Sequence, residues 1–224
     1  MSPREYFGDW SRVVSFKELS EVLKKLQAID PEQLCPSPGN VFRAFKLCPY
    51  KDLKVVFLGQ DPYPQKGVAT GILFGNKDRT PEDKLSPSLK IIKESCINYE
   101  IPHNTILFDN TLESWAKQGV LMLNSALTCK VNEIGSHTML WRKFITLLLQ
   151  NLSYRDSGII YVLFGAQAQT FEPYINDKYN HIIKVEHPAY FSRNNKIMPY
   201  SVFTDINRLL NDRYGETIKW YTEY

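Results

Sequence analysis

The sequence contains few cysteines and no long apolar run. Its four cysteines are scattered through 224 residues and form no C-x-x-C pair; they are Cys35, Cys48, Cys96 and Cys129. This spacing argues against zinc or iron–sulfur ligation and favours reduced, mostly buried thiols, so we expect no metal and no cofactor. No stretch approaches the roughly 20 apolar residues of a membrane span, and the first residues lack the apolar core of a signal peptide. We expect a soluble protein without membrane contact, cytoplasmic or, in a eukaryotic cell or a viral host, nuclear.

Net charge of one sign is almost absent. The chain has 27 Lys and Arg against 24 Asp and Glu, a formal net charge of +3. This mildly basic balance permits a nucleic-acid partner but does not require one. Hydrophobic residues make up 43% and aromatic residues 13% of the chain, which is typical of a globular domain with a well-buried core. Because repeats, low-complexity tracts and linkers are also missing, we predict one domain over residues 1–224, acting as a monomer.

Four short apolar runs predict strands. They are LKVVFLG (53–59), GVLMLNSAL (119–127), GIIYVLFG (158–165) and HIIKVEHP (181–188). The first and third lack strict alternation, which suits strands covered on both faces, as in a parallel sheet. Helical patterns lie around them; these are 16–26, a segment from Ser86, a segment from Asp109 or Asn110 to Gly119, 138–152, 166–175, and a segment from Pro199 to Gly215. The alternation predicts an α/β fold with a central four-stranded parallel sheet flanked by helices.

Each apolar run ends in polar or turn-forming residues. The endings are Gln60-Asp61-Pro62-Tyr63-Pro64, Asn124, Gly165-Ala166-Gln167 and Glu186-His187-Pro188. Carboxyl ends of parallel strands share one sheet edge, and ligands bind just outside it, so Asp61, Asn124 and His187 are expected to converge. Taken singly, Asp61 also suits a turn, Asn124 a cap and His187 a buried core. Their coincidence favours a site, and Pro62 and Pro64 would hold the carboxylate rigidly, as electrostatic catalysis requires.

Signatures of several other α/β enzymes are missing. No G-x-G-x-x-G follows a strand, and neither G-x-x-x-x-G-K-[ST] nor G-x-S-x-G occurs. Dinucleotide binding, P-loop chemistry and a serine-hydrolase triad therefore lack their sequence support.

The motifs that are present resemble, in their order, the uracil-DNA glycosylases, specifically the large family-1 branch, over roughly residues 9–210. The matching segments are GQDPY (59–63), GILF (71–74), LSPSL (85–89), WAKQGVLMLNSALT (115–128), LFGAQAQ (163–169) and HPAYFS (187–192). The resemblance implies a uracil-DNA glycosylase-like fold and a base excision repair enzyme without a lyase step. Such an enzyme flips deoxyuridine out of DNA and hydrolyses the N-glycosidic bond, which releases uracil and leaves an abasic site.

The resemblance assigns catalysis to Asp61 and His187. Asp61 would orient the attacking water and face the cationic sugar of the transition state, and backbone N–H groups around Gln60 and Asp61 would assist. A neutral His187 would donate a hydrogen bond to O2 of the base, where negative charge accumulates.

The same resemblance assigns uracil recognition to Gln60, Tyr63, Phe74 and Asn124. The amide of Asn124 would meet O4 and N3–H of uracil, an edge that cytosine cannot match. Tyr63 would fill the space that the C5 methyl group of thymine needs, and Phe74 would stack on the base.

DNA contacts are implied for residues in three further segments. They are Ser86, Pro87, Ser88, Gly165, Ala166, Phe191 and Ser192. Phe191 stands where the family has leucine and would be the wedge that fills the gap left by the flipped base. Arg193 and Lys196 either attract DNA or are solvated loop charges. The implied partner is uracil-containing DNA, single- or double-stranded, and a proteinaceous inhibitor of uracil glycosylases is a second candidate partner.

Besides Phe191, five positions depart from the family pattern. They are Pro64, Gly75, Ala166, Ala189 and Tyr190. Serines lost at Ala166 and Ala189 would weaken the grip on DNA without touching the catalytic pair. A DNA-binding or polymerase-accessory protein with weak or no catalysis is the alternative function, but the presence of both Asp61 and His187 favours an enzyme. Activity on another damaged base also stays open, because Tyr63 is the only visible filter against a methyl group.

Overall fold

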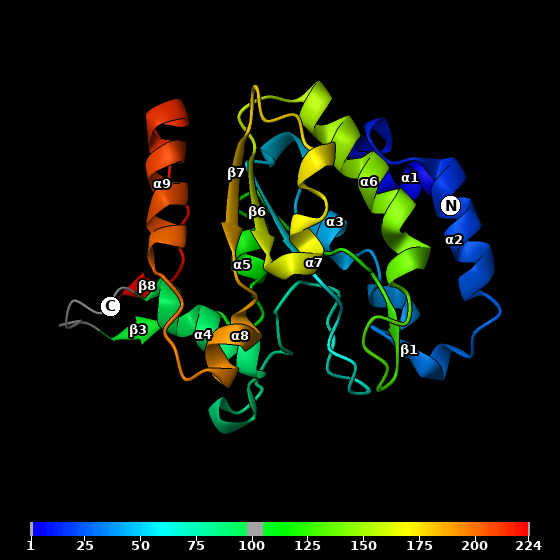
Figure 1. Cartoon of the computed structure of the whole chain (residues 1–224), viewed down its shortest axis with the longest axis horizontal. Helices are drawn as coiled ribbons and strands as arrows, with labels where there is room; N and C mark the ends of the chain where they lie inside the picture. The colour runs from blue at the N-terminus through cyan, green and yellow to red at the C-terminus, as the bar shows by residue number, and fades with distance from the viewer. Residues whose placement is uncertain (1, 98–104, 224) are drawn as a thin grey trace.

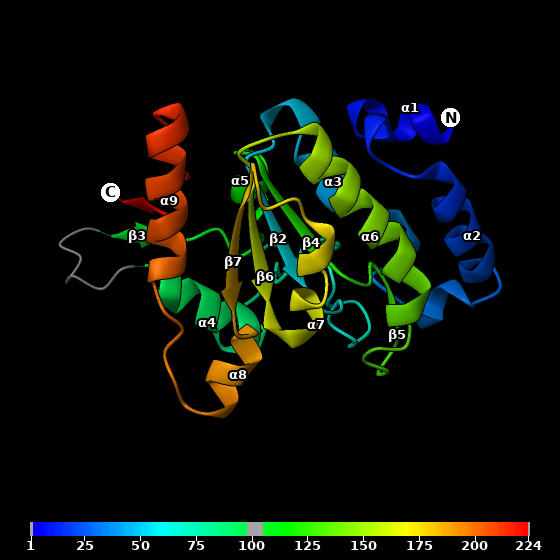
Figure 2. The same ribbon diagram turned by 45° about the horizontal axis from the view of Figure 1, so that its top comes forward.

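The computed structural model describes residues 2–97 and 105–223. Its centre is a sheet of four parallel strands in the order β4–β2–β6–β7. The strands are β2 (Val55–Gly59), β4 (Val120–Asn124), β6 (Ile160–Phe164) and β7 (His181–Val185). Figure 2 shows all four side by side. The predicted fold class is confirmed, and each strand lies inside the apolar run that predicted it.

The two faces of the sheet bury separate apolar clusters. Alternating residues of β2 divide between them: Val56 and Leu58 face one cluster, and Val55 and Phe57 face the other. Every residue of β2, β4 and β6 is buried. Burial on both faces therefore explains the continuous apolar runs, whereas the edge strand β7 is more exposed and carries the exposed Lys184.

Helices cover both faces. One side holds α1 (Pro3–Phe7), α2 (Phe16–Leu26), α3 (Arg43–Leu47) and α6 (Thr138–Arg155). The other side holds α4 (Pro87–Cys96), α5 (Glu113–Ala116) and α9 (Ser201–Tyr214). Figure 1 shows α1, α2 and α6 on one side of the sheet and α9 on the other. Two short helices, α7 (Gly165–Gln169) and α8 (Pro188–Arg193), lie at the end where the strand arrows point.

Small elements complete the fold. The antiparallel pairs are β1 (Leu34–Cys35) with β5 (Cys129–Lys130), and β3 (Ile106–Leu107) with β8 (Thr222–Glu223). The 3₁₀ turns are η1 (Gly8–Arg12), η2 (Pro31–Gln33), η3 (Pro38–Asn40), η4 (Tyr50–Asp52), η5 (Glu82–Lys84) and η6 (Glu172–Tyr174). All four cysteines are free and buried, as predicted. Within the described ranges, no helix combines the length and apolar character needed to cross a bilayer.

The helix predicted from Asp109 or Asn110 is wrong in its start. Only Glu113–Ala116 is helical, and Leu112 before it has a left-handed backbone with φ of 59°. The carboxylate of Asp109 instead accepts hydrogen bonds from the backbone N–H groups of Thr111 and Ser114, at 2.9 and 2.8 Å. A side chain that binds nearby backbone in this way competes with helix formation.

Candidate active site

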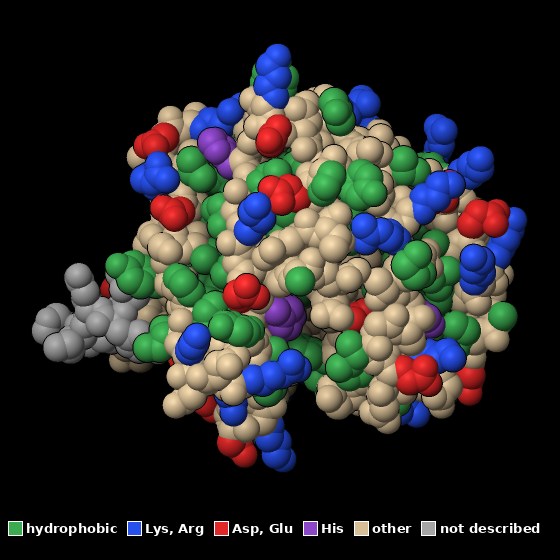
Figure 3. Space-filling model, in the orientation of Figure 1, with side chains coloured by type: hydrophobic (Ala, Val, Ile, Leu, Met, Phe, Trp, Pro, Cys, Tyr) green, Lys and Arg blue, Asp and Glu red, His purple; other side chains and the backbone are tan. Residues whose placement is uncertain are grey.

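A pocket of about 380 Å³ opens at the carboxyl edge of the sheet. It is lined by seven of the predicted site residues: Gln60, Asp61, Tyr63, Phe74, Ser88, Asn124 and His187. The expected convergence of Asp61, Asn124 and His187 is therefore confirmed. In the space-filling view a histidine lies at the rim of a hollow in the middle of this face, with both acidic and basic side chains near it (Figure 3).

Asp61 is separated from β2 only by Gln60 and is held by the loop before α6. Its Oδ2 accepts a hydrogen bond from the backbone N–H of Gly135 at 3.1 Å. Its Oδ1 is buried and has no hydrogen-bond partner among the described residues, so the acceptor capacity of this oxygen is unused. Burial raises the pKa of the Asp61 carboxyl, and hydrogen bonds from Gly135 and Gln60 counteract part of that effect.

The turn that carries Asp61 is tied down on both sides. The carbonyl of Gln60 accepts hydrogen bonds from the N–H of Ala126 and the hydroxyl of Ser125, both at 3.0 Å. The carbonyl of Pro64 accepts one from the N–H of Asn132 at 2.9 Å. Because the prolines lock φ and neighbouring segments bind the carbonyls, the carboxylate has a fixed position in the pocket.

Asn124 is the last residue of β4 and stands in register with Gly59 of β2. The residue is 8% exposed, and its Oδ1 has no hydrogen-bond partner in residues 2–97 and 105–223. An amide offers both donors and an acceptor. Asn124 therefore lines the pocket with an unused acceptor, and a buried acceptor of this kind is costly unless a ligand or water pairs with it.

His187 follows β7 and caps the N-terminus of α8. Its Nδ1 accepts a hydrogen bond from the N–H of Ala189 at 3.2 Å. In the neutral ring the proton therefore lies on Nε2, which makes that nitrogen a donor. Burial, assisted by the nearby positive charge of Arg193, lowers the pKa of His187 to about 4. His187 can take this position only because residue 165 is glycine. The φ of Gly165 is +81°, and a Cβ on it would lie 2.8 Å from Cβ of His187.

Two aromatic residues form a wall of the pocket. The hydroxyl of Tyr63 donates a hydrogen bond to the carbonyl of Phe74 at 3.0 Å. Phe74 has a left-handed backbone with φ of 63°, and its ring meets those of Phe164 and His187 edge to face at 5.1 and 5.7 Å. The ring is thus fixed beside His187, where a planar base can stack on it.

The residues predicted to hold DNA occupy different kinds of position. Ser88 lines the pocket, while Pro87, Ala166 and Ser192 are exposed and Gly165 is buried. Ser86 is also buried, and its side chain accepts a hydrogen bond from the amide of Asn76 at 2.8 Å. The side chain of Ser86 therefore supports the pocket wall rather than facing solvent.

Phe191 does not have the position predicted for a wedge. Its side chain is 8% exposed and packs in the apolar cluster beneath α4 and α9. The segment after His187 forms helix α8, so successive side chains point in directions about 100° apart. Tyr190 is the one that points outward: it is 39% exposed and lines the pocket.

The sequence reasoning also missed Gly135 and Ile134. Ile134 is 66% exposed at the pocket, and Gly135 supplies the hydrogen bond to Asp61 across 74 residues of chain. Their loop has no periodic pattern and ends none of the predicted strands. The pairing of β1 with β5, which brings this loop to the pocket, involves strands of two residues each, too short to recognise from a pattern.

The pocket combines a carboxylate with an unpaired oxygen, a neutral imidazole donor and an amide with an unpaired oxygen around one stacking surface. This combination defines an enzyme that cleaves a bond to a planar, hydrogen-bonding ring. In residues 2–97 and 105–223, no cluster of three or more His, Cys, Asp and Glu side chains is placed to bind a metal ion. The model of the uracil DNA glycosylase superfamily matches residues 45–211. The chain belongs to this superfamily.

Individual relatives agree with the family. The chain is 33% identical over 225 residues to the uracil-DNA glycosylase of Fusobacterium nucleatum, covering 96% of each chain. It is 36% identical over 194 residues to that of Campylobacter jejuni strain 81-176, covering 85% of this chain and 80% of the other. The crystal structure of mimivirus uracil-DNA glycosylase is 25% identical, with a TM-score of 0.74, and covers 98% of this chain and 93% of that one. A tyrosine variant of the mimivirus enzyme in complex with UGI is 26% identical, with a TM-score of 0.77 and coverage of 98% and 88%.

Proposed function

We propose that this chain is a family-1 uracil-DNA glycosylase, with Asp61 and His187 as its catalytic residues. Its activity is the hydrolysis of the bond between uracil and deoxyribose in DNA, which releases uracil and leaves an abasic site for base excision repair. The observation that carries the proposal is the pocket in which the unpaired oxygen of Asp61, the unpaired amide oxygen of Asn124 and the neutral ring of His187 meet.

Recognition requires that the base leave the stack, because the pocket cannot reach it inside a duplex. The flipped uracil stacks on Phe74. Asn124 pairs with the base edge, its Oδ1 accepting from N3–H and its amide N–H group donating to O4. Tyr63 occupies the side of the pocket where a C5 methyl group would project, so thymine is excluded by shape.

Bond cleavage proceeds with cationic character in the sugar. The electron pair of the glycosidic bond moves onto the uracil ring, whose O2 becomes more negative and accepts a hydrogen bond from Nε2 of His187. Asp61 stabilises the cationic sugar and orients a water molecule, whose oxygen bonds to the anomeric carbon while its proton passes to Asp61 or to solvent. No oxidant or reductant takes part in this sequence.

A neutral His187 suits this role because its Nε2–H donates to O2 of the base in the form of the ring that is present near pH 7. Its pKa of about 4 keeps the ring neutral near pH 7. Burial favours the neutral form of Asp61 as well, which raises its pKa, so the carboxylate gains stabilisation when the sugar becomes cationic.

Tyr190 replaces Phe191 in our proposal as the wedge that enters the gap in the duplex. Its ring is exposed at the mouth of the pocket and packs edge to face on buried Phe191 at 5.4 Å. An aromatic wedge can also stack on the neighbouring bases. Ser88, Ser192 and the backbone at Gly165 and Ala166 would then hold the DNA backbone on both sides of the flipped nucleotide.

We also propose how the enzyme is assembled, where in the cell it acts and which protein it meets. The enzyme acts as a monomer on single- or double-stranded DNA, in the cytoplasm or in the nucleus of a eukaryotic or infected cell. Because variants of the mimivirus relative form complexes with UGI, an inhibitor protein is a second expected partner. A DNA-binding role without catalysis gains no support from any described contact.

The test is incubation of the protein with oligonucleotides that contain one uracil, single-stranded or opposite adenine or guanine, followed by alkali to cleave abasic sites. Matched strands with thymine, including a T·G mismatch, are the control. We expect cleavage of the uracil strands alone, and the same rate in excess chelator. Retention of DNA without any abasic site would favour the DNA-binding alternative, and loss of activity in chelator that added divalent ions restore would contradict the metal-independent mechanism.

A further inference from the structure

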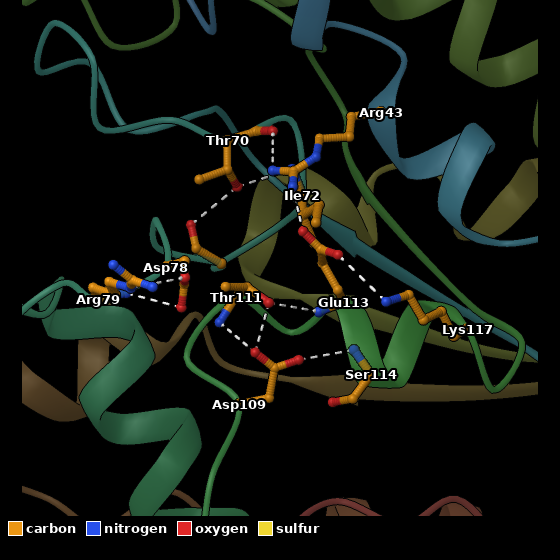
Figure 4. Close-up of polar contacts among 11 residues, drawn as sticks. Arg43, Thr70, Ile72, Asp78, Arg79, Asp109, Thr111, Glu113, Ser114 and Lys117 are labelled. Carbon is orange, nitrogen blue, oxygen red and sulfur yellow. Dashed lines mark hydrogen bonds and ion pairs between the residues drawn. The ribbon is translucent and has the colours of Figure 1, made fainter.

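The loop that presents Phe74 is anchored by a charged side chain from another layer of the fold. Nη1 of Arg43, on α3, donates a hydrogen bond to the carbonyl of Thr70 at 3.3 Å. The same guanidinium forms an ion pair with Glu113 on α5. Figure 4 shows Arg43 between the loop and the helix, with both contacts drawn.

This ion pair differs from an ordinary surface pair. The side chains of Arg43 and Glu113 are 31% and 25% exposed, and exposed pairs are worth little because water and salt screen them. Lys117 contacts the other carboxylate oxygen of Glu113 at 3.6 Å, but its side chain is 64% exposed, and no hydrogen bond or ion pair joins it to residues 70–75 among the described contacts. Arg43 alone therefore links the carboxylate to the loop.

The loop itself has little freedom to absorb a change. Thr70 closes it internally, because its hydroxyl donates to the carbonyl of Gly75 at 3.2 Å and accepts from the N–H of Ile72 at 3.4 Å. Gly71 has a φ of +82°, and a Cβ there would lie 1.9 Å from the carbonyl oxygen of Asn40. A shift at Thr70 must therefore be passed along the loop, and Phe74 is within it.

Contact from the segment before α5 explains one departure from the family pattern. A Cβ on Gly75 would lie 2.5 Å from the carbonyl oxygen of Thr111, so a serine cannot take this place without moving the segment that leads into α5. At Gly75 the loop is thus packed directly on the backbone that precedes Glu113.

We propose that Arg43 and Glu113 are a positioning pair that fixes the loop of residues 70–75 so that Phe74 stands at stacking distance from the base. The proposal rests on the proposed function, since it concerns how tightly that function's pocket binds uracil. Neither residue lines the pocket, so neither touches substrate. The pair acts through Thr70, and the hydroxyl of Tyr63 holds the same loop at the carbonyl of Phe74.

The experiment compares Arg43→Gln, Glu113→Gln and the double variant with Lys117→Gln as the matched control. Calorimetry measures the affinity for free uracil, which needs no catalysis, and steady-state kinetics on a uracil oligonucleotide separate KM from kcat. We expect Arg43→Gln to weaken uracil binding about tenfold, the effect of one charge-assisted hydrogen bond, and to raise KM more than it lowers kcat. Arg43→Lys should recover part of the affinity, and Lys117→Gln should leave it unchanged.

The double variant, Arg43→Gln with Glu113→Gln, tests whether the two side chains act together. Because both side chains act through one contact, its loss of uracil affinity should be no larger than that of Arg43→Gln alone. Thermal unfolding of each variant reports on folding, and if Arg43→Gln does not fold, Arg43→Lys and Glu113→Gln carry the same comparison. Wild-type uracil affinity in Arg43→Gln, or equal losses in Arg43→Gln and Lys117→Gln, would overturn the proposal. A wild-type protein that binds uracil but excises none would instead contradict the proposed function and leave the affinity comparison valid.

Discussion

Gly135 donates its backbone N–H to Oδ2 of Asp61 over 3.1 Å, and Oδ1 has no hydrogen-bond partner in the part of the chain that the structure describes. The two oxygens of this carboxylate thus differ. Oδ2 is fixed by the backbone, and Oδ1 keeps the acceptor capacity that the proposed mechanism uses to orient water. The backbone donor remains in place whatever side chain occupies position 61. Substitutions that keep the shape of Asp61 can therefore separate its charge from its position.

Asn124→Asp should weaken uracil binding and admit cytosine. The substitution replaces the amide donor, which would meet O4 of uracil, with a carboxylate oxygen that can accept from the amino group of cytosine. Excision from matched strands with one uracil or one cytosine measures the change, and Asn124→Ala, which can read neither base, is the control. Wild-type excision of uracil by Asn124→Asp would show that this side chain does not read the base.

Tyr63→Ala should permit release of thymine, most readily from a T·G mismatch, because it removes the ring that blocks a C5 methyl group. The same substitution removes the hydrogen bond to the carbonyl of Phe74, so uracil excision should also fall. Tyr63→Phe separates the two effects: it keeps the ring and loses only the hydroxyl. We expect Tyr63→Phe to exclude thymine, and thymine release by that variant would place the filter in the loop rather than in the ring.

Tyr190→Ala should slow excision from duplex DNA much more than from single strands, since only a duplex has a paired stack for the wedge to enter. Stacking of an aromatic ring on a base is worth roughly 1–3 kcal/mol. The measurement is the ratio of single-turnover rates on the two substrates, in the variant and in the wild type. An unchanged ratio would mean that Tyr190 does not enter the duplex.

Phe191→Ala is the matched variant for that comparison. Because Phe191 is buried in the core, its loss should lower the free energy of unfolding by about 3–5 kcal/mol. At low temperature, where the Phe191→Ala protein is folded, it should lose activity on duplex and on single-stranded DNA to a similar degree. A selective loss on duplex DNA would return the wedge to Phe191.

Activity should fall as the pH drops, through two groups that act in the same direction. Asp61 must be charged, and its pKa is raised by burial, while His187 must be neutral, and its pKa is lowered to about 4. Protonation of either one removes the catalytic form, so both set the acid limb of the pH–rate profile. The higher of the two pKa values should mark the pH below which the rate falls.

Arg193→Gln should move this acid limb to higher pH. Arg193 is the second cause of the low pKa of His187, after burial, so removing its charge raises that pKa and the ring becomes protonated sooner. Arg193→Lys keeps the charge and should leave the limb where it is. A limb that is identical in all three proteins would mean that Asp61 alone sets it.

The sequence was sufficient to predict the sheet and the convergence of Asp61, Asn124 and His187 on one pocket, for a physical reason. Strands buried on both faces, such as β2, must be apolar throughout, and the change to Gln60-Asp61-Pro62 marks their end without ambiguity. Asn124 and His187 follow strands in the same way. These positions depend on chain direction and sheet geometry, which a pattern of apolar residues records.

Positions that depend on packing between distant segments could not be read in this way. Phe191 and Tyr190 are adjacent aromatic residues, and only the helical conformation of α8 decides which of them is buried. Gly135 and Arg43 act through a backbone N–H and through a contact with a backbone carbonyl. Neither contact leaves a periodic signal in the sequence, so both became visible only from the fold.

The most direct test of the account is the single-turnover rate of uracil excision by Asp61→Asn, measured together with its affinity for uracil-containing DNA. The amide keeps the size of the carboxylate and can still accept the hydrogen bond from Gly135, so binding should change little. The loss of charge facing the cationic sugar should lower the rate by about 10²-fold or more. Excision at the wild-type rate would contradict the assignment of Asp61, and with it the mechanism proposed for this pocket.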